Sequence, residues 1–161
     1  MKTICFLTIF VWMWFNSDLA EIRKIYPKVA DSESNAKEFS SKLTNITFES
    51  EKTLIAYKGA SIALISKYSK GLNKRINTFK EGVKWIEFAI EKEPKNIEAR
   101  LVRLSVQENV PGITGYRKNI KEDAAFIMSH YKEQSAALKE YLIDFIKQSK
   151  SINDAEKQSI K

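Results

Sequence analysis

Apolar residues recur three and four positions apart along nearly the whole chain after residue 21, and this spacing constrains the fold more than any other feature. Stripes of this kind fall within residues 22–30, 36–46, 54–68, 72–90, 97–104, 116–131 and 138–146. No stretch shows the strict alternation of a half-buried strand, and 5 Gly and 3 Pro in 161 residues are too few for an all-β fold. We therefore predict a single all-α domain of about seven helices.

Helix-breaking and helix-capping residues set the expected limits of these helices. Pro27 should shorten the first helix, Pro94 should end the fourth, and Pro111 should stop the fifth. Ser50 is the expected N-cap of the third helix, because a serine side chain can accept a hydrogen bond from a free N–H of the first turn. Residues 21–150 should form the helical domain, and residues 151–161 should be a frayed or short helical tail.

The first twenty residues have the features of a secretory signal peptide. Lys2 supplies a positive charge, and Ile4 to Phe15 form an apolar run that only Thr8 interrupts. This run is too short to span a bilayer as a helix. We predict that residues 1–20 are removed and that the mature protein is exported to the periplasm or outer envelope. The alternative is an uncleaved anchor that lies in the membrane interface.

Cysteine and histidine usage excludes several kinds of chemistry. Cys5 is the only cysteine and lies in the predicted signal peptide, so the mature chain can form neither a disulfide nor a thiolate metal site. His130 is the only histidine, which argues against histidine-based metal centres and Ser–His catalysis. The chain has no P-loop, dinucleotide-binding glycine pattern or EF-hand loop. We expect no cofactor and no metal site.

The predicted fifth helix is apolar on two sides and should lie at the centre of the fold. Ile97, Leu101 and Leu104 fall on one side, while Val102 and Val106 fall almost opposite. Candidate binding residues follow one flank and the end of this helix: Arg100, Arg103, Gln107, Glu108 and Asn109.

Two interpretations of that flank are open. The arginines could hold a carboxylate or phosphate ligand through paired hydrogen bonds. Alternatively, they could belong to an internal ion-pair network in which Glu108 pairs with an arginine and Asn109 fixes the following loop.

Two aromatic residues of the predicted fourth helix are further binding candidates. Phe88 lies nearly opposite the apolar stripe of this helix, and Trp85 lies at its edge. An exposed aromatic side chain on a polar face would indicate a partner surface. Burial of Phe88 under another helix is the alternative.

Positive charge is concentrated around the start of the fourth helix. Between Lys67 and Lys84, six basic residues face one acid, Glu81. Export argues against nucleic acid as a partner, so the alternatives are an anionic lipid or lipopolysaccharide surface and a solvated face.

A short segment resembles the tetratricopeptide repeat family, in which small residues lie where paired helices touch and a proline ends the unit. The residues that carry this resemblance are Gly82, Ile86, Ala89, Ile90, Pro94, Asn96 and Ala99. The pattern does not recur after the 34 residues of the family's period, so the resemblance implies a stack of helical hairpins that differs from a regular array.

More broadly, the chain resembles small secreted helical proteins of unassigned function from Bacteroidota-type bacteria. Four segments carry this second resemblance: residues 57–60, residues 79–82, residues 98–111 and residues 115–123. It implies a location in the envelope of a Gram-negative cell and implies no activity.

These features predict an exported, non-enzymatic helical protein that binds another protein or a peptide in the cell envelope. One alternative is a small secreted hydrolase of cell-wall glycan that uses Glu98 or Glu108 with Asp123 as its carboxylate pair. Another is a protein that binds anionic lipid surfaces. We expect no membrane-spanning helix in the mature chain.

Overall fold

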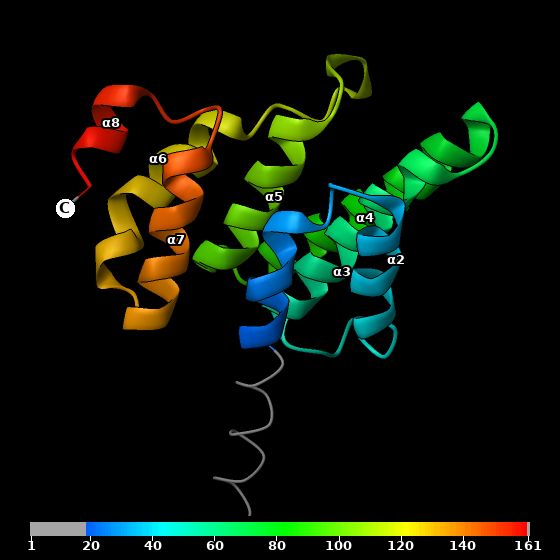
Figure 1. The fold of residues 1–161 in the computed structure, drawn as a ribbon, viewed down its shortest axis with the longest axis horizontal. Helices are drawn as coiled ribbons and strands as arrows, with labels where there is room; N and C mark the ends of the chain where they lie inside the picture. Colours follow the sequence, from blue (N-terminus) through cyan, green and yellow to red (C-terminus); the bar gives the residue numbers. More distant parts are fainter. Residues whose placement is uncertain (1–18, 161) are drawn as a thin grey trace, which may run out of the picture.

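The computed structural model describes residues 19–160, and these residues confirm the all-α prediction (Figure 1). Residues 19–25 are helical, and seven further α-helices follow. These helices are α2 (Glu33–Lys42), α3 (Lys52–Ile65), α4 (Leu72–Lys92), α5 (Ile97–Asn109), α6 (Ile120–His130), α7 (Ala136–Gln148) and α8 (Asp154–Gln158). Short 3-10 turns join several of them, and no strand occurs within residues 19–160.

Local sequence signals explain most of the helix limits, with one correction at the start of α3. The first helix gives way to a 3-10 turn at Tyr26–Lys28, where Pro27 stands. The predicted N-cap Ser50 is wrong, because the carboxylate of Glu51 accepts the hydrogen bond from the Thr53 N–H instead. A negatively charged carboxylate at this position also interacts favourably with the positive, N-terminal end of the helix dipole.

The other helix ends follow the same rules. The sixth helix begins at Ile120, four residues after Tyr116, and Gly115, with a positive φ of 66°, lies in the loop that precedes it. In the predicted tail, Asn153 and Glu156 form a reciprocal capping box that begins α8. The predicted tail therefore contains a short helix of five residues.

Helices α3 and α4 touch through their backbones at Gly59 and Gly82. A Cβ atom built on Gly82 would lie 2.5 Å from the backbone nitrogen of Ala63 and 2.5 Å from the carbonyl oxygen of Gly59. A Cβ atom on Gly59 would lie 2.6 Å from the carbonyl oxygen of Gly82. Only glycine allows this approach, since real Cβ atoms do not come this close to backbone atoms.

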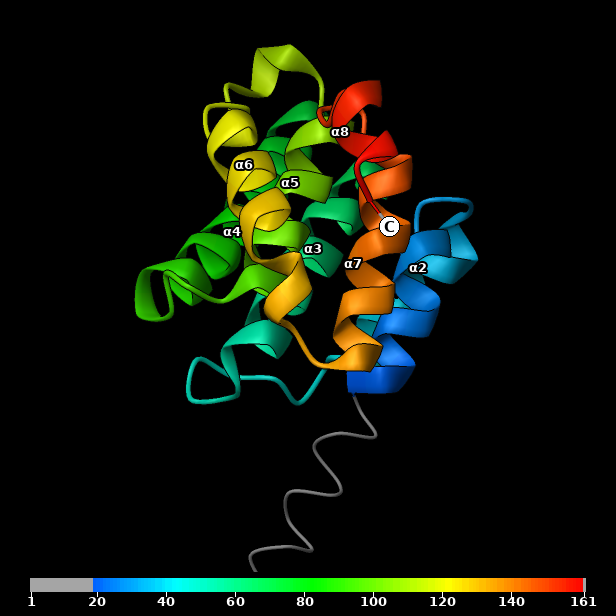
Figure 2. The ribbon, with the colours of Figure 1, turned by 90° about the vertical axis from the view of Figure 1, so that its left-hand side faces the viewer.

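Helix α5 occupies the centre of the fold, as its two apolar sides predict. It packs against α3, α4, α6 and α7, and every residue from Ile97 to Leu104 is buried. Two views at right angles both show α5 enclosed by the other helices (Figures 1 and 2). The side chains of this helix therefore set the environment on each side of the core.

The first turns of α4 extend beyond the rest of the fold (Figure 1). Every residue from Gly71 to Asn77 is exposed. The apolar stripe of this helix therefore continues past the core, and it leaves 72% of Leu72 and 41% of Ile76 accessible to solvent. Exposed aliphatic side chains in a row are unusual on a helix that has no neighbour.

The predicted signal peptide falls almost entirely outside the described residues. Of residues 1–20, only Leu19 and Ala20 are described, and both belong to the helix that continues through Ile25. Leu19 also packs against the hydrophobic core. Among the described helices, none combines the length and the apolar character needed to cross a membrane.

Candidate functional site

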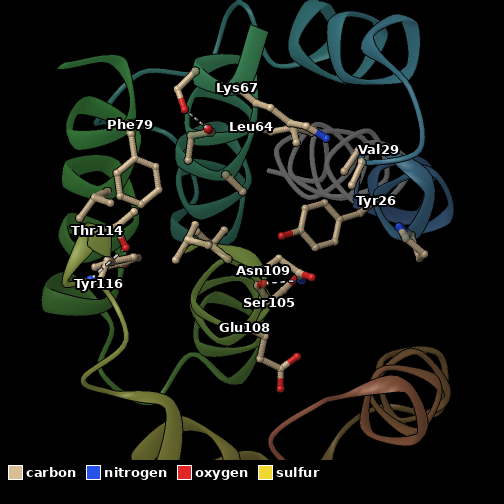
Figure 3. A pocket seen from close by; sticks show the side chains of 18 of the residues that line it. Tyr26, Val29, Leu64, Lys67, Phe79, Ser105, Glu108, Asn109, Thr114 and Tyr116 are labelled. Atoms are coloured by element: carbon tan, nitrogen blue, oxygen red, sulfur yellow. Dashed lines mark hydrogen bonds between the residues drawn. The ribbon is translucent and has the colours of Figure 1, made fainter. Parts of the chain in front are cut away.

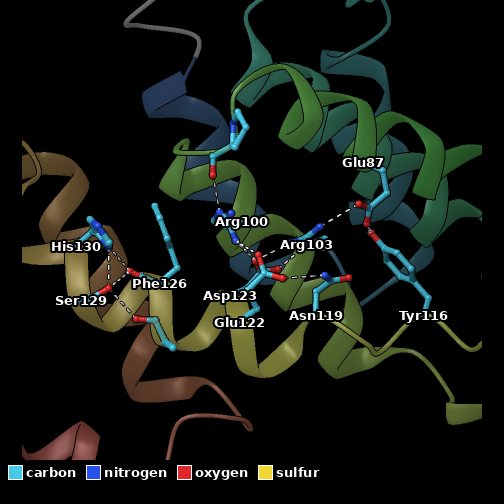
Figure 4. Close-up of polar contacts among 12 residues, drawn as sticks. Glu87, Arg100, Arg103, Tyr116, Asn119, Glu122, Asp123, Phe126, Ser129 and His130 are labelled. Carbon is cyan, nitrogen blue, oxygen red and sulfur yellow. Dashed lines mark hydrogen bonds and ion pairs between the residues drawn. The ribbon is translucent and has the colours of Figure 1, made fainter.

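The two arginines of α5 are held in a buried ion-pair network with Asp123 of α6 (Figure 4). Arg103 donates from Nε to one oxygen of the Asp123 carboxylate at 2.6 Å and from Nη2 to the other at 2.8 Å. Arg100 donates to the same carboxylate at 2.9 Å and to Glu122 at 2.8 Å. Asp123 is fully buried, and the two guanidinium groups balance its negative charge.

The network continues to α4 through Glu87. This carboxylate accepts a hydrogen bond from Nη1 of Arg103 at 2.9 Å and another from the Tyr116 hydroxyl at 2.7 Å. Burial disfavours the charged form of Arg103, but Asp123 and Glu87 outweigh that effect and raise its pKa. All three nitrogens of the Arg103 guanidinium are therefore engaged by carboxylates within the protein.

The remaining candidates at the end of α5 have partners that the sequence did not predict. Glu108 pairs with no arginine; it accepts hydrogen bonds from the Ser149 hydroxyl and, at 2.9 Å, from the Ser151 N–H. Asn109 donates to the carbonyl oxygen of Ser105 and accepts from Lys150 at 2.6 Å. These contacts fix the segment between α7 and α8 against α5.

Gln107 has a different environment from its neighbours. Its side chain is fully buried, and neither of its polar atoms has a hydrogen-bond partner among the described residues. Nothing in the structure explains a polar residue at this position.

Trp85 and Phe88 belong to an aromatic cluster with Phe48, a residue of the loop between α2 and α3. The Phe48 ring stacks on Trp85 with centroids 4.0 Å apart and meets Phe88 edge-on at 4.7 Å. Lys52 and Lys92 both lie over the Phe88 ring. A loop therefore half-buries Phe88, where the sequence suggested either full exposure or cover by a helix.

A second buried network surrounds Glu98. Arg23 donates two hydrogen bonds to its carboxylate, at 2.8 and 2.6 Å, and the Tyr57 hydroxyl donates a third at 2.8 Å. The Tyr57 hydroxyl also lies 3.1 Å from the Tyr141 hydroxyl. This network joins the first helix, α3, α5 and α7. It engages Glu98, one of the two residues that the hydrolase alternative offers as the partner of Asp123.

Buried tyrosines predict that the protein unfolds in alkali. Burial raises the pKa of Tyr26 to about 12 and raises the pKa values of Tyr57, Tyr116 and Tyr141 as well. In the unfolded chain these phenols ionise near pH ~10, so their contribution to stability is complete below that pH. As the pH rises further, each group removes about 1.4 kcal/mol per pH unit until it ionises in the folded state.

The check is far-UV circular dichroism recorded together with phenolate absorbance during an alkaline titration. We expect helicity to fall as the phenolates form between pH ~10 and ~12. Ionisation of all the tyrosines near pH ~10 with full helicity would contradict this prediction.

The structure does not gather a pair of candidate catalytic carboxylates in one cavity. Glu98 is held by Arg23 and Tyr57, Asp123 is held by Arg100 and Arg103, and Glu108 is held by the segment that follows α7. Within residues 19–160, no cluster of three or more His, Cys, Asp or Glu side chains could hold a metal ion.

A groove of about 1930 Å³ lies between the first helix, α3, α4, α5, α7 and the loop after α5 (Figure 3). We call this feature the groove. Its lining is mainly apolar and includes Leu64, Ile76, Phe79, Val83, Val106 and Ile113. In Figure 3, Phe79, Leu64 and Val29 face a common space from three different elements.

Three large aliphatic side chains are exposed along the edge of the groove. Leu72 and Ile76 come from the projecting end of α4, and Ile113 comes from the loop after α5, where 97% of its surface is accessible. Within residues 19–160, every other large hydrophobic side chain is buried or partly buried. These three exposed side chains therefore all belong to the lining of one groove.

Of the candidates predicted from sequence, only Glu108 and Asn109 line the groove. The sequence held two signals for it: the apolar stripe of the fourth helix was longer than the core required, and Val106 lay on the second apolar side of the fifth. Neither signal shows which side of a helix remains uncovered.

Comparison with known proteins gives no relative for this chain. No protein-family model, no curated protein and no solved structure matches its sequence or its fold.

Proposed function

We propose that this protein is a binding module that holds a helical segment of a partner protein in the groove. The observation that carries the proposal is the gathering of Leu72, Ile76 and Ile113 along the edge of an apolar groove. Full burial of such a side chain provides roughly 1.5–3 kcal/mol, and the part of this that remains available is greatest for Ile113 and least for Ile76. A partner that covers them would recover part of that free energy.

The size of the groove fits a helix better than a small molecule. Small-molecule pockets usually enclose about 300–1,000 Å³, and the groove encloses about 1930 Å³. A cylinder ~10 Å across and ~25 Å long has a similar volume and corresponds to a helix of about 16 residues. Amphipathic helices bind in apolar grooves of this kind through residues three and four positions apart.

Substitution of Ile76 by aspartate tests the proposal. We expect Ile76→Asp to weaken the binding of a fluorescent amphipathic helical peptide at least ~10-fold, because an apolar contact of about 1.5 kcal/mol or more is replaced by a charge. Fluorescence anisotropy measures the change. The variant should fold, since Ile76 lies on the projecting end of α4.

Ala125→Asp is the matched control. It adds the same charge at an exposed position of α6 that does not line the groove. The control should bind the peptide as the unaltered protein does. Equal binding by both variants would show that the groove is not the binding site.

A second candidate function is attachment to an anionic lipid surface. It is favoured by the projecting end of α4, where Lys70 and Lys74 are exposed beside Leu72, and by the absence of Asp and Glu between Glu51 and Glu81. Clustered cations next to an exposed apolar residue are typical of protein surfaces that meet such membranes.

We also propose that the protein acts outside the cytoplasm, because its first twenty residues have the pattern of a signal peptide. An exported form that begins at Glu21 would support this proposal, and one that begins at Met1 would contradict it.

A further inference from the structure

We infer that the partner helix carries acidic residues beside its apolar face. This inference rests on the proposed function, and it names the chemistry of the segment that the groove would hold. The argument comes from the charged residues that line the groove and from which of them are already paired within the protein.

The ammonium groups of four lysines that line the groove take part in no hydrogen bond or ion pair within residues 19–160. Lys24 comes from the first helix, Lys67 from the turn after α3, Lys80 from α4, and Lys118 from the segment before α6. In Figure 3, Lys67 extends from the end of α3 toward Val29.

Two carboxylates of α4 and α5 that line the groove already accept hydrogen bonds within the protein. Glu87 lines the groove, but Arg103 and the Tyr116 hydroxyl engage it. Glu108 also lines the groove and accepts hydrogen bonds from Ser149 and Ser151. The unbalanced charge on the α3 and α4 side of the groove is therefore positive.

Negative charge without a cationic partner lies at Glu108, at the end of α5, and on α7. Glu140 and Asp144 of α7 line the groove, and no ion pair within the described chain involves either of them. A partner helix with acidic residues toward α3 and α4, and with a neutral or basic edge toward α7, complements both regions. Such complementarity contributes to specificity and to orientation.

The test compares three helical peptides of about 16 residues, the length of a helix whose volume equals that of the groove. They share one apolar face and differ in whether the flanking positions are Glu, Gln or Lys. We expect the Glu peptide to bind about tenfold more tightly than the Gln peptide, with the Lys peptide weakest, because several exposed charge pairs add their small contributions. Added salt should reduce this difference.

A charge-reversal variant provides the second arm. Lys67→Glu combined with Lys80→Glu should abolish or reverse the preference for the Glu peptide. Both lysines are exposed, so the variant should keep its melting temperature. The matched control is Lys121→Glu combined with Lys147→Glu, which changes the net charge equally at exposed positions that do not line the groove. The control should keep the preference.

The outcomes separate this inference from the proposed function. Equal binding of all three peptides, lost in Ile76→Asp, would overturn the acidic partner and leave the groove as a peptide site. Failure of every peptide to bind would contradict both. A parallel arm measures binding to anionic phosphatidylglycerol vesicles and to neutral phosphatidylcholine vesicles. One outcome is that the protein binds the anionic vesicles, loses this binding in the Lys67/Lys80 reversal and shows no preference among the peptides. That outcome would overturn the acidic helix and indicate a lipid surface as the partner.

Discussion

Gly82→Ala should destabilise the protein by about 2–4 kcal/mol, although alanine is normally the better helix former by ~1 kcal/mol. The added methyl group would lie 2.5 Å from two backbone atoms of α3, on Ala63 and on Gly59. A side chain could rotate away from such a clash, but a backbone atom cannot move without the whole helix. We expect α3 and α4 to separate and the melting temperature to fall by ~10 °C.

Gly112→Ala is the control for this prediction. A Cβ atom on Gly112 meets nothing within 4 Å, and the residue does not take a positive φ. Its melting temperature should change little or rise slightly. Thermal unfolding of both variants checks the account. A Gly82→Ala protein as stable as Gly112→Ala would show that the two helices are not in backbone contact.

Asp123→Asn should destabilise the protein by about 3 kcal/mol or more, because it leaves two buried guanidinium groups without their shared carboxylate. The amide keeps the size of the side chain, so the change in charge is the main effect. Arg103→Ala should also lower the melting temperature, since it removes two of the hydrogen bonds to Asp123. An arginine reserved for a ligand would instead be lost without any cost in stability.

Glu122→Gln separates buried from exposed pairing within the same network. The Glu122 side chain is 57% accessible, and its ion pair with Arg100 should contribute only about 0–1 kcal/mol. Chemical denaturation should therefore rank Asp123→Asn far below Glu122→Gln in stability. Similar midpoints for the two variants would contradict the conclusion that Asp123 is the centre of the network.

The fold class could be predicted because helical periodicity is a local property. Each apolar stripe indicated a helix, and the two apolar sides of the fifth helix indicated its central position, which the contacts of α5 confirm. The start of α3 was missed, since Ser50 and Glu51 are both able to cap a helix and only the backbone conformation selects between them.

The contacts between distant residues could not be predicted from spacing. Arg100 and Arg103 were recognised as a pair, but their carboxylate lies 23 and 20 positions away from them, on α6 rather than at Glu108. The partner of Glu98 lies farther still, 75 positions away at Arg23. Several carboxylates were available for each arginine, and only the packing of the helices decides among them.

The groove escaped prediction for a related reason. An apolar stripe shows that a helix face avoids water, but it does not show where the protein ends and a partner would begin. At Ile86 the stripe of α4 is covered by the core, and at Leu72 it is exposed. The same pattern therefore serves folding at one end of the helix and, in our proposal, binding at the other.

The central claim is that the groove holds a helical partner segment, and chemical-shift mapping of the isotope-labelled protein tests it most directly. On addition of the peptide with Glu flanks, we expect the largest amide shifts around Ile76, Val83, Val106 and Ile113, which line the groove. The cluster of Phe48, Trp85 and Phe88, which does not line it, should be unaffected. Shifts centred on that cluster, or no shifts at all, would contradict the account.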